Sequence, residues 1–164
     1  MSDSPIKILI AEDTEPLRRL YKKIINAAPD MKVVADTDTG KDAVTLTLQT
    51  QPDVILMDIE METPDAGLRA VESILGAKQN PKIIILTVYE EDELIFTAFR
   101  LGVIDYLIKN APPQEILESI RNAYLNQSPL RPELASKILG EFKRVKTYET
   151  SFLFAVDIVS SLTT

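Results

Sequence analysis

Four apolar runs of this chain each end at a side chain that can bind a metal ion or a phosphate. These side chains are Glu12 and Asp13 after residues 6–11, Asp58 after 53–57, Thr87 after 82–86 and Lys109 after 104–108. If the runs are parallel strands of one sheet, all of these groups emerge at its carboxyl edge, where open α/β sheets bind ligands. Three carboxylates, a hydroxyl and an ammonium group there suit a divalent cation and a transferable phosphoryl group.

Asp58 is the candidate nucleophile, because a carboxylate oxygen that attacks phosphorus gives an aspartyl phosphate. The attack brings two anions together, and Mg²⁺ held by Asp13 and Asp58, with Glu12 binding directly or through water, offsets their repulsion. Lys109 and Thr87 can contact the phosphoryl oxygens. Each residue alone also fits an ordinary role, such as a helix cap or a solvated charge. Their joint placement favours a phosphoryl-transfer site.

The composition excludes several other classes of site. A net charge of -7 has the wrong sign for a nucleic-acid surface. The chain has no cysteine and no histidine, so it lacks thiolates and the commonest transition-metal ligand. A bound metal is therefore expected to be a hard ion such as Mg²⁺. No apolar run reaches the roughly 18 residues of a membrane span, and no signal peptide is evident, so we expect a cytoplasmic protein without membrane contact.

Strand-like and helix-like patterns alternate five times along the chain. The expected strands are residues 7–11, 31–35, 53–57, 82–86 and 104–108, and helices follow at 15–27, 40–49, about 68–75, 90–101 and 113–126. This alternation predicts an α/β fold, a doubly wound five-stranded parallel sheet in the flavodoxin-like order 2-1-3-4-5. The apolar residues expected to face the core are Leu17, Leu20, Tyr21, Ile24 and Ile25 in the first helix and Ile116, Leu117, Ile120 and Tyr124 in the last.

The alternation stops near residue 127, and a different pattern follows. Residues 132–146 have the spacing of an extra C-terminal amphipathic helix, and residues 147–164 are too apolar for a free tail. We therefore predict two parts, a domain at residues 1–127 and an extension at residues 128–164.

Four segments together resemble the receiver domain of bacterial two-component response regulators. They are ILIAED (8–13), DVILMDIEM (53–61), IIILT (83–87) and DYLIKN (105–110), within a match covering about residues 6–126. The resemblance implies that Asp58 accepts a phosphoryl group from a phosphohistidine of a sensor histidine kinase. It also implies further roles: Mg²⁺ bound by Glu12, Asp13, Asp58 and the backbone carbonyl of Glu60, phosphoryl contact by Lys109, and a switch pair of Thr87 and Tyr106.

The same resemblance has consequences for activity and output. It implies no enzyme activity beyond the protein's own phosphorylation and slow self-dephosphorylation, and a homodimer as the output state. Residues 130–142 resemble the linker helix of LuxR-type (NarL/FixJ-like) regulators. We therefore expect a receiver and linker truncated before a helix-turn-helix domain, with DNA bound only through that absent domain. A natural stand-alone receiver remains open.

One loop departs from the family pattern, and two other functions remain alternatives. The family usually has Met-Pro after the phosphoacceptor, whereas here Met61 is followed by Glu62 and the proline is displaced to Pro64. This predicts an unusually shaped loop and leaves open a degenerate receiver that signals without phosphate. Asp58 and Glu60 also imitate the paired acids of haloacid-dehalogenase-like phosphatases. That family, however, carries its nucleophile on an early strand near the N-terminus.

Overall fold

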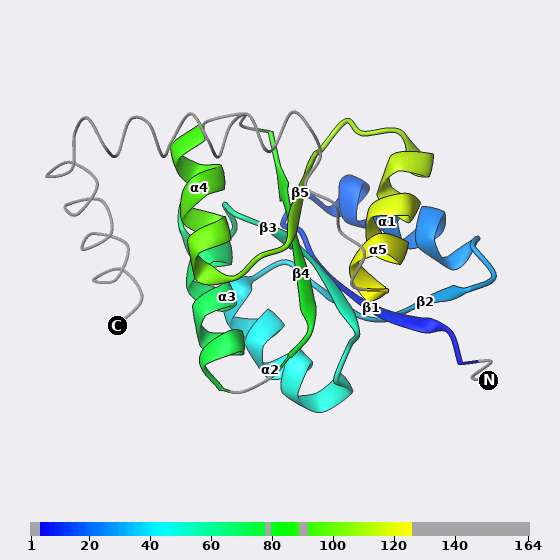
Figure 1. Cartoon of the computed structure of the whole chain (residues 1–164), viewed down its shortest axis with the longest axis horizontal. Helices are drawn as coiled ribbons and strands as arrows, with labels where there is room; N and C mark the ends of the chain where they lie inside the picture. The colour runs from blue at the N-terminus through cyan, green and yellow to red at the C-terminus, as the bar shows by residue number, and fades with distance from the viewer. Residues whose placement is uncertain (1–3, 78–79, 89–91, 126–164) are drawn as a thin grey trace, which may run out of the picture.

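The computed structural model describes residues 4–77, 80–88 and 92–125, which form one parallel sheet with helices on both faces (Figure 1). Along the chain the elements are β1 (Ile6–Ala11), α1 (Glu15–Asn26), β2 (Met31–Thr37), α2 (Gly40–Thr50), β3 (Val54–Asp58), α3 (Ala66–Gly76), β4 (Lys82–Thr87), α4 (Asp92–Leu101), β5 (Asp105–Ile108) and α5 (Pro113–Tyr124). The strand order is β2-β1-β3-β4-β5. The predicted fold class and strand order are confirmed. The predicted extra helix and apolar tail lie outside the described residues.

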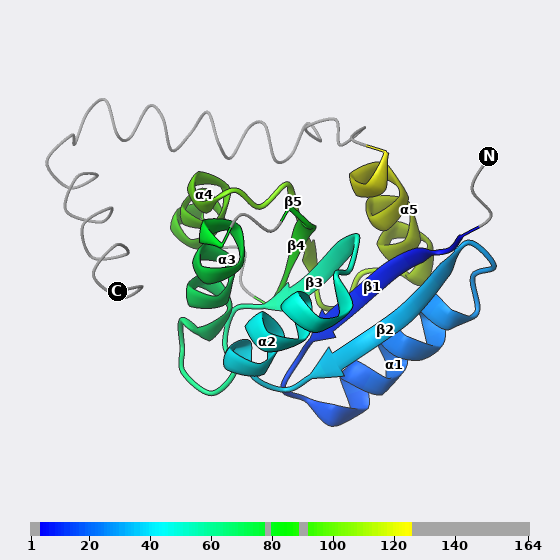
Figure 2. The same ribbon diagram turned by 90° about the horizontal axis from the view of Figure 1, so that it is seen from below.

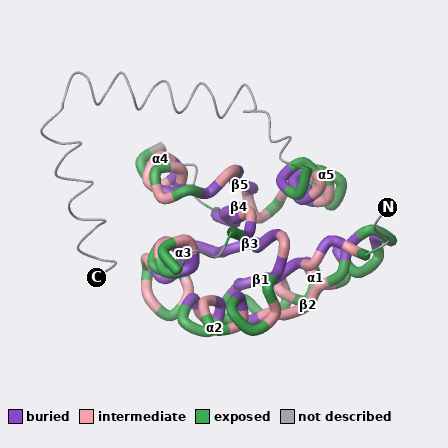
Figure 3. Tube along the Cα trace, turned by 60° about the horizontal axis from the view of Figure 1, so that its bottom comes forward, coloured by how far each residue is buried: buried purple, intermediate pink, exposed green. Residues whose placement is uncertain are grey.

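The sheet is the middle of three layers. Helices α1 and α5 cover one face and α2, α3 and α4 cover the other (Figure 1, Figure 2). Every residue of β3 is buried, as are all but the first of β4, so these strands carry continuous apolar sequence. Figure 3 shows burial concentrated in the strands and on the inner sides of the helices. Within the described residues, no helix is long and apolar enough to cross a membrane.

Two residues expected in the core are exposed instead. The side chains of Tyr21 and Ile25 are buried under α1, but Leu20 is 49% exposed. Leu20 precedes Tyr21 and therefore lies about 100° around the helix from it, at the margin of the apolar stripe. Tyr124, the last residue of α5, is 44% exposed, whereas Ile120 and Ile116, one and two turns earlier, are buried. The expectation was wrong at these two positions.

The strand register brings the predicted site residues to one edge of the sheet. Ala11 pairs with Met57, so Glu12 and Asp58, which follow them, lie at the same level on neighbouring strands. The pairings continue across the sheet, with Asp58 opposite Leu86 and Thr87 opposite Ile108. The backbone N–H of Lys109 also donates to the carbonyl of Thr87 at 3.0 Å. The parallel register therefore places the ends of β1, β3, β4 and β5 side by side.

Helix α3 begins against the backbone at the end of β3, and a glycine permits this approach. The N–H of Gly67 donates to the carbonyl of Ile59 at 2.8 Å. A Cβ atom built on Gly67 would lie 1.9 Å from the carbonyl oxygen of Asp58. No side chain fits at that distance from backbone, so Gly67 sets how closely α3 packs against the strand that carries Asp58.

The loop between β3 and α3 is anchored to the N-terminus of α2 by Glu62. Its carboxylate accepts hydrogen bonds from the N–H groups of Gly40 at 2.7 Å and Lys41 at 2.9 Å. These are the first two helical residues, whose N–H groups have no partner within the helix. The Thr39 hydroxyl accepts from the N–H of Asp42, the next residue. Burial alone would raise the pKa of Glu62, but the N–H donors of Lys41 and Gly40 outweigh it and lower the pKa.

Substitution of Gly67 by alanine should destabilise the fold strongly, because the added methyl group collides with backbone that cannot move aside. We expect Gly67→Ala to lower the free energy of unfolding by about 3 kcal/mol or more. Gly76 is the matched control, since a Cβ there meets nothing within 4 Å. Gly76→Ala should change stability by between zero and about 1 kcal/mol in the favourable direction. Urea unfolding of both variants checks this, and equal stabilities would contradict the close approach.

Removal of the Glu62 carboxylate should expose its role as a cap. Glu62→Ala should lower the free energy of unfolding by about 1–2 kcal/mol, because two helix N–H groups lose their acceptor. Glu118→Ala removes the same charge from an exposed position on α5 and should change stability by less than about 0.5 kcal/mol. Urea unfolding at pH 7 compares the two. A loss at Glu62 no larger than at Glu118 would show that the cap does not stabilise the protein.

Candidate functional site

Three carboxylates predicted as metal ligands lie together at the carboxyl edge of the sheet. One oxygen of each of Glu12, Asp13 and Asp58 lies within 4.8 Å of the others. Glu12 is fully buried and Asp58 is 3% exposed, whereas Asp13 is exposed. Glu12 and Asp13 follow β1, and Asp58 is the last residue of β3. The register of these two neighbouring strands therefore creates the cluster.

Lys109 brings its positive charge directly between the two buried carboxylates. Its Nζ atom lies 2.8 Å from Oε1 of Glu12 and 2.9 Å from Oδ2 of Asp58. Both of these oxygens are buried and, apart from this ammonium group, have no hydrogen-bond partner within the described residues. One ammonium group thus serves two carboxylates, and the cluster with Asp13 keeps a negative balance.

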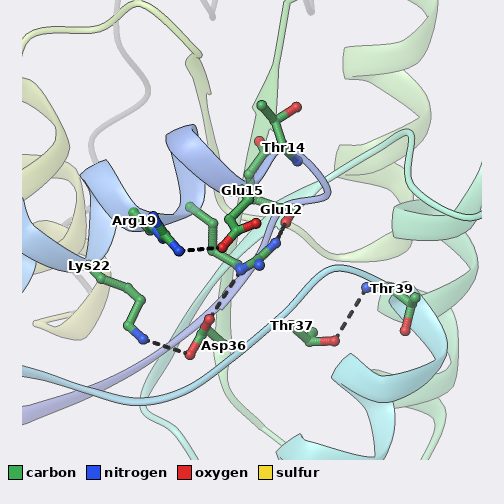
Figure 4. Close-up of polar contacts among 9 residues, drawn as sticks. Glu12, Thr14, Glu15, Arg19, Lys22, Asp36, Thr37 and Thr39 are labelled. Atoms are coloured by element: carbon green, nitrogen blue, oxygen red, sulfur yellow. Dashed lines mark hydrogen bonds and ion pairs between the residues drawn. The ribbon is translucent and has the colours of Figure 1, made fainter.

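Glu12 is held in place by contacts that the sequence did not indicate. Its Oε2 atom accepts from the N–H of Thr14 at 3.0 Å, and its backbone carbonyl accepts from Nη1 of Arg18 at 2.7 Å. Nε of Arg18 donates in turn to Asp36 at 3.1 Å. Figure 4 shows Asp36 also paired with Lys22, at 3.0 Å. These contacts fix the turn from β1 into α1 against β2, which orients Glu12 toward Lys109.

The surroundings separate the acidities of the clustered groups. Burial raises the pKa of Asp58 first, Lys109 lowers it and the charge of Glu12 raises it, which leaves a pKa of about 7. Burial also acts to raise the pKa of Asp13, but hydrogen bonds with Glu12 and Asp58 and the charge of Lys109 leave it below its usual value. For Lys109, burial favours the neutral form, yet its contacts with Glu12 and Asp58 outweigh this and raise its pKa. The lysine is therefore a permanent cation here.

An open pocket of about 200 Å³ lies over these groups. Its lining includes Asp13, Asp58, Glu60, Thr87 and Lys109. The groups here that could bind a metal ion offer oxygen atoms, and the carboxylates outnumber the single ammonium group of Lys109. The pocket therefore fits a hard divalent cation such as Mg²⁺. The structure thus brings together all of the predicted ligand and phosphoryl-contact residues.

The two predicted switch residues lie on neighbouring strands, but only one lines the pocket. Thr87 is 2% exposed at the end of β4 and lines it. Tyr106 is 8% exposed in β5, and its side chain packs in the core on the side of α3 and α4. Asp105 accepts hydrogen bonds from the N–H of Tyr106 at 2.8 Å and the hydroxyl of Ser119 at 2.6 Å. A buried aspartate, not indicated by the sequence, thus ties Tyr106 to α5.

Comparisons with known proteins agree with this geometry. The family model for the response regulator receiver domain matches residues 8–121. The chain is 36% identical over 146 residues to the uncharacterized transcriptional regulatory protein YxjL of Bacillus subtilis, which covers 89% of this chain and 66% of that protein. It is 34% identical over 137 residues to the oxygen regulatory protein NreC of Staphylococcus carnosus, covering 84% of this chain and 63% of that protein. The chain thus spans slightly less than two thirds of these curated relatives.

A solved structure gives the same result. The crystal structure of a DNA-binding response regulator of the LuxR family from Staphylococcus aureus matches with a TM-score of 0.68 and 31% identity. The match covers 73% of this chain and 98% of the solved chain. The receiver model spans well over half of the 164 residues, and the strand order and acidic pocket agree with it. The chain therefore belongs to the response regulator receiver domain family, and the solved structures that it resembles include a LuxR-family member.

Proposed function

We propose that this protein is a phosphorylation-dependent signalling switch in which Asp58 accepts a phosphoryl group from a phosphohistidine of a sensor histidine kinase. The observation that carries the proposal is the placement of Asp58, which is buried, clustered with two acids, paired with Lys109 and open to a pocket. A carboxylate oxygen of Asp58 forms the new O–P bond while the P–N bond to the imidazole breaks. The electron pair of the broken bond stays on the imidazole nitrogen.

Mg²⁺ is the expected cofactor, held by Glu12, Asp13, Asp58 and the backbone carbonyl of Glu60. When bound, it supplies positive charge that offsets the repulsion between the carboxylate and the incoming phosphoryl group. The pKa of about 7 for Asp58 supports a role for a bound cation. Without one, a large share of the carboxyl group is protonated near neutral pH. A protonated carboxyl group is a poor nucleophile, so added positive charge beside it favours the reactive form.

Lys109 and Thr87 supply the remaining contacts to the phosphoryl group. Lys109 already lies against Asp58, and its flexible side chain lets the ammonium group follow the charge onto a phosphoryl oxygen. Thr87 lines the same pocket and offers a hydroxyl donor. Both groups stabilise the charge that develops on the transferred phosphoryl group.

The output of the switch is a change in the surface next to α4. In our proposal, phosphate on Asp58 draws Thr87 inward and lets Tyr106 rotate into the space behind it. The side chains of both residues are buried in this structure. The two states must differ in affinity for a partner, and homodimer formation is the partner reaction we propose. The solved relative is described as a DNA-binding response regulator. By that similarity we propose that this chain regulates transcription through a DNA-binding domain outside these 164 residues.

Phosphorylation of Asp58 can be tested by mass spectrometry after incubation with acetyl phosphate and Mg²⁺, a small phosphoryl donor in place of the kinase. The wild type should gain one phosphoryl group and Asp58→Asn none. Asp53→Asn is the matched control, because Asp53 precedes the same strand at its other end, where its Oδ2 accepts from the N–H of Lys7. Asp53→Asn should be phosphorylated as the wild type is. Size-exclusion chromatography of the same samples reports the change in oligomeric state.

The other outcomes separate the competing functions. No phosphoryl group on the wild type would contradict the proposal and favour the degenerate receiver that signals without phosphate. Repeated turnover of a generic phosphate ester, with loss of activity in Asp58→Asn, would instead indicate a phosphatase. Phosphorylation without a change in oligomeric state would support Asp58 as the phosphoacceptor and contradict homodimer formation as the output.

A further inference from the structure

A buried tyrosine reaches from α1 to the backbone of the residue that carries the site's cation. Tyr21 is 1% exposed, and its hydroxyl donates a hydrogen bond to the carbonyl oxygen of Lys109 at 3.1 Å. The two residues are 88 positions apart in the sequence. This bond joins α1, which follows β1, to the loop that follows β5. In the sheet, β3 and β4 lie between β1 and β5. The bond therefore ties together two segments that have no direct strand pairing.

The hydroxyl of Tyr21 completes a pair of restraints on the main chain of Lys109. The N–H of Lys109 donates to the carbonyl of Thr87 at 3.0 Å, which fixes one side of the residue. The Tyr21 hydroxyl binds its carbonyl and fixes the other side. The ammonium group of a lysine sits at the end of a flexible four-carbon stem, so the position of the backbone sets the range of places that the group can reach. Here it reaches Glu12 and Asp58 together.

The tyrosine ring and its hydroxyl have separable roles. The ring packs in the apolar core under α1 and α5, and a phenylalanine would fill the same volume. Burial first, and then the negative charges of Glu12 and Asp58, raise the pKa of the Tyr21 hydroxyl. The hydroxyl therefore stays protonated near neutral pH and can act as a hydrogen-bond donor. Its orientation toward a carbonyl, rather than its charge, is what it contributes to the site.

We propose that Tyr21 is a positioning residue that holds the backbone of Lys109 so that its ammonium group meets the phosphoryl group on Asp58. This inference rests on the proposed function of Asp58 and extends it to a residue that lines neither the pocket nor the carboxylate cluster. Loss of the hydroxyl leaves the metal-binding acids in place. Phosphoryl transfer should therefore suffer while Mg²⁺ binding does not.

The first test compares Tyr21→Phe with the wild type in the rate of phosphorylation by acetyl phosphate. We expect the rate to fall by about threefold to tenfold, the value of one hydrogen bond, with Mg²⁺ affinity within about twofold of the wild type. Tyr124→Phe is the matched control, because Tyr124 is exposed at the end of α5. Tyr124→Phe should be phosphorylated at the wild-type rate. Equal rates for Tyr21→Phe and wild type would overturn the proposal, as would parallel losses of rate and Mg²⁺ affinity.

A second comparison separates positioning of Lys109 from a general structural effect. In a Lys109→Ala background the ammonium group is absent, so adding Tyr21→Phe should slow phosphorylation no further. An equal fall in both backgrounds would show that the hydroxyl acts through the fold and not through Lys109.

A third readout does not depend on phosphorylation. The amide NMR signals of Lys109 and Asn110 should shift in Tyr21→Phe, since the carbonyl between them loses its donor. Unshifted signals would overturn the proposed restraint, whether or not the wild type is phosphorylated. If the signals shift but the wild type takes no phosphate, the restraint stands and the proposed function is contradicted.

Discussion

One ammonium group between two buried carboxylates is the interaction on which the site depends. Nζ of Lys109 lies within 2.9 Å of both Glu12 and Asp58, and the three residues come from three separate segments of the chain. Such a contact needs the ends of β1, β3 and β5 at one level, and the parallel register supplies this. A shift of one residue in any of these pairings would turn the acid or the lysine to the other face of the sheet. The apolar strands therefore determine where the charges meet.

The site has more negative than positive charge, with three carboxylates and one ammonium group. Buried carboxylates are costly unless they are paired, and here one cation serves two of them with a third acid beside them. Burial is the main reason that the pKa of Asp58 is raised, and the charge of Glu12 adds to it. The buried apolar side chains of the strands offset this cost. Polar contacts hold the surrounding segments in place, namely Arg18 on Glu12, Glu62 on the β3–α3 loop and Tyr21 on Lys109. A site left short of positive charge is suited to accept a divalent cation.

Much of this arrangement follows from the sequence, because it depends on patterns repeated along the chain. Continuous apolar runs predict buried parallel strands, and the residue after each run then has only one edge at which to emerge. Glu12, Asp58 and Lys109 could be placed together for that reason. Leu20 and Tyr124 were placed wrongly, since apolar spacing alone does not show where a helix stops facing the sheet.

The supporting contacts could not be predicted from the sequence. Glu62 looked like a disturbance in the loop beside the site, yet its carboxylate caps α2, which is distant in the sequence. Tyr21 looked like one more core residue, because apolar periodicity describes its ring and is silent about its hydroxyl. Such contacts depend on the orientation of one polar atom after the elements have packed. Fold and charge placement are thus readable from pattern, while the restraints that orient the charged groups are not.

A crystal structure of the protein with Mg²⁺ and beryllium fluoride, a phosphoryl mimic, would show whether Asp58 accepts the phosphoryl group beside Lys109. We expect the mimic to be bonded to the Asp58 carboxylate, with Mg²⁺ at about 2.1 Å from oxygens of Asp13 and Asp58. Lys109 should then contact a fluoride while its backbone carbonyl keeps the hydrogen bond from Tyr21. A mimic and ion bound away from this cluster would contradict the assignment of Asp58 as phosphoacceptor. Lys109 still bridging Glu12 and Asp58, with no adduct formed at saturating mimic, would contradict it as well.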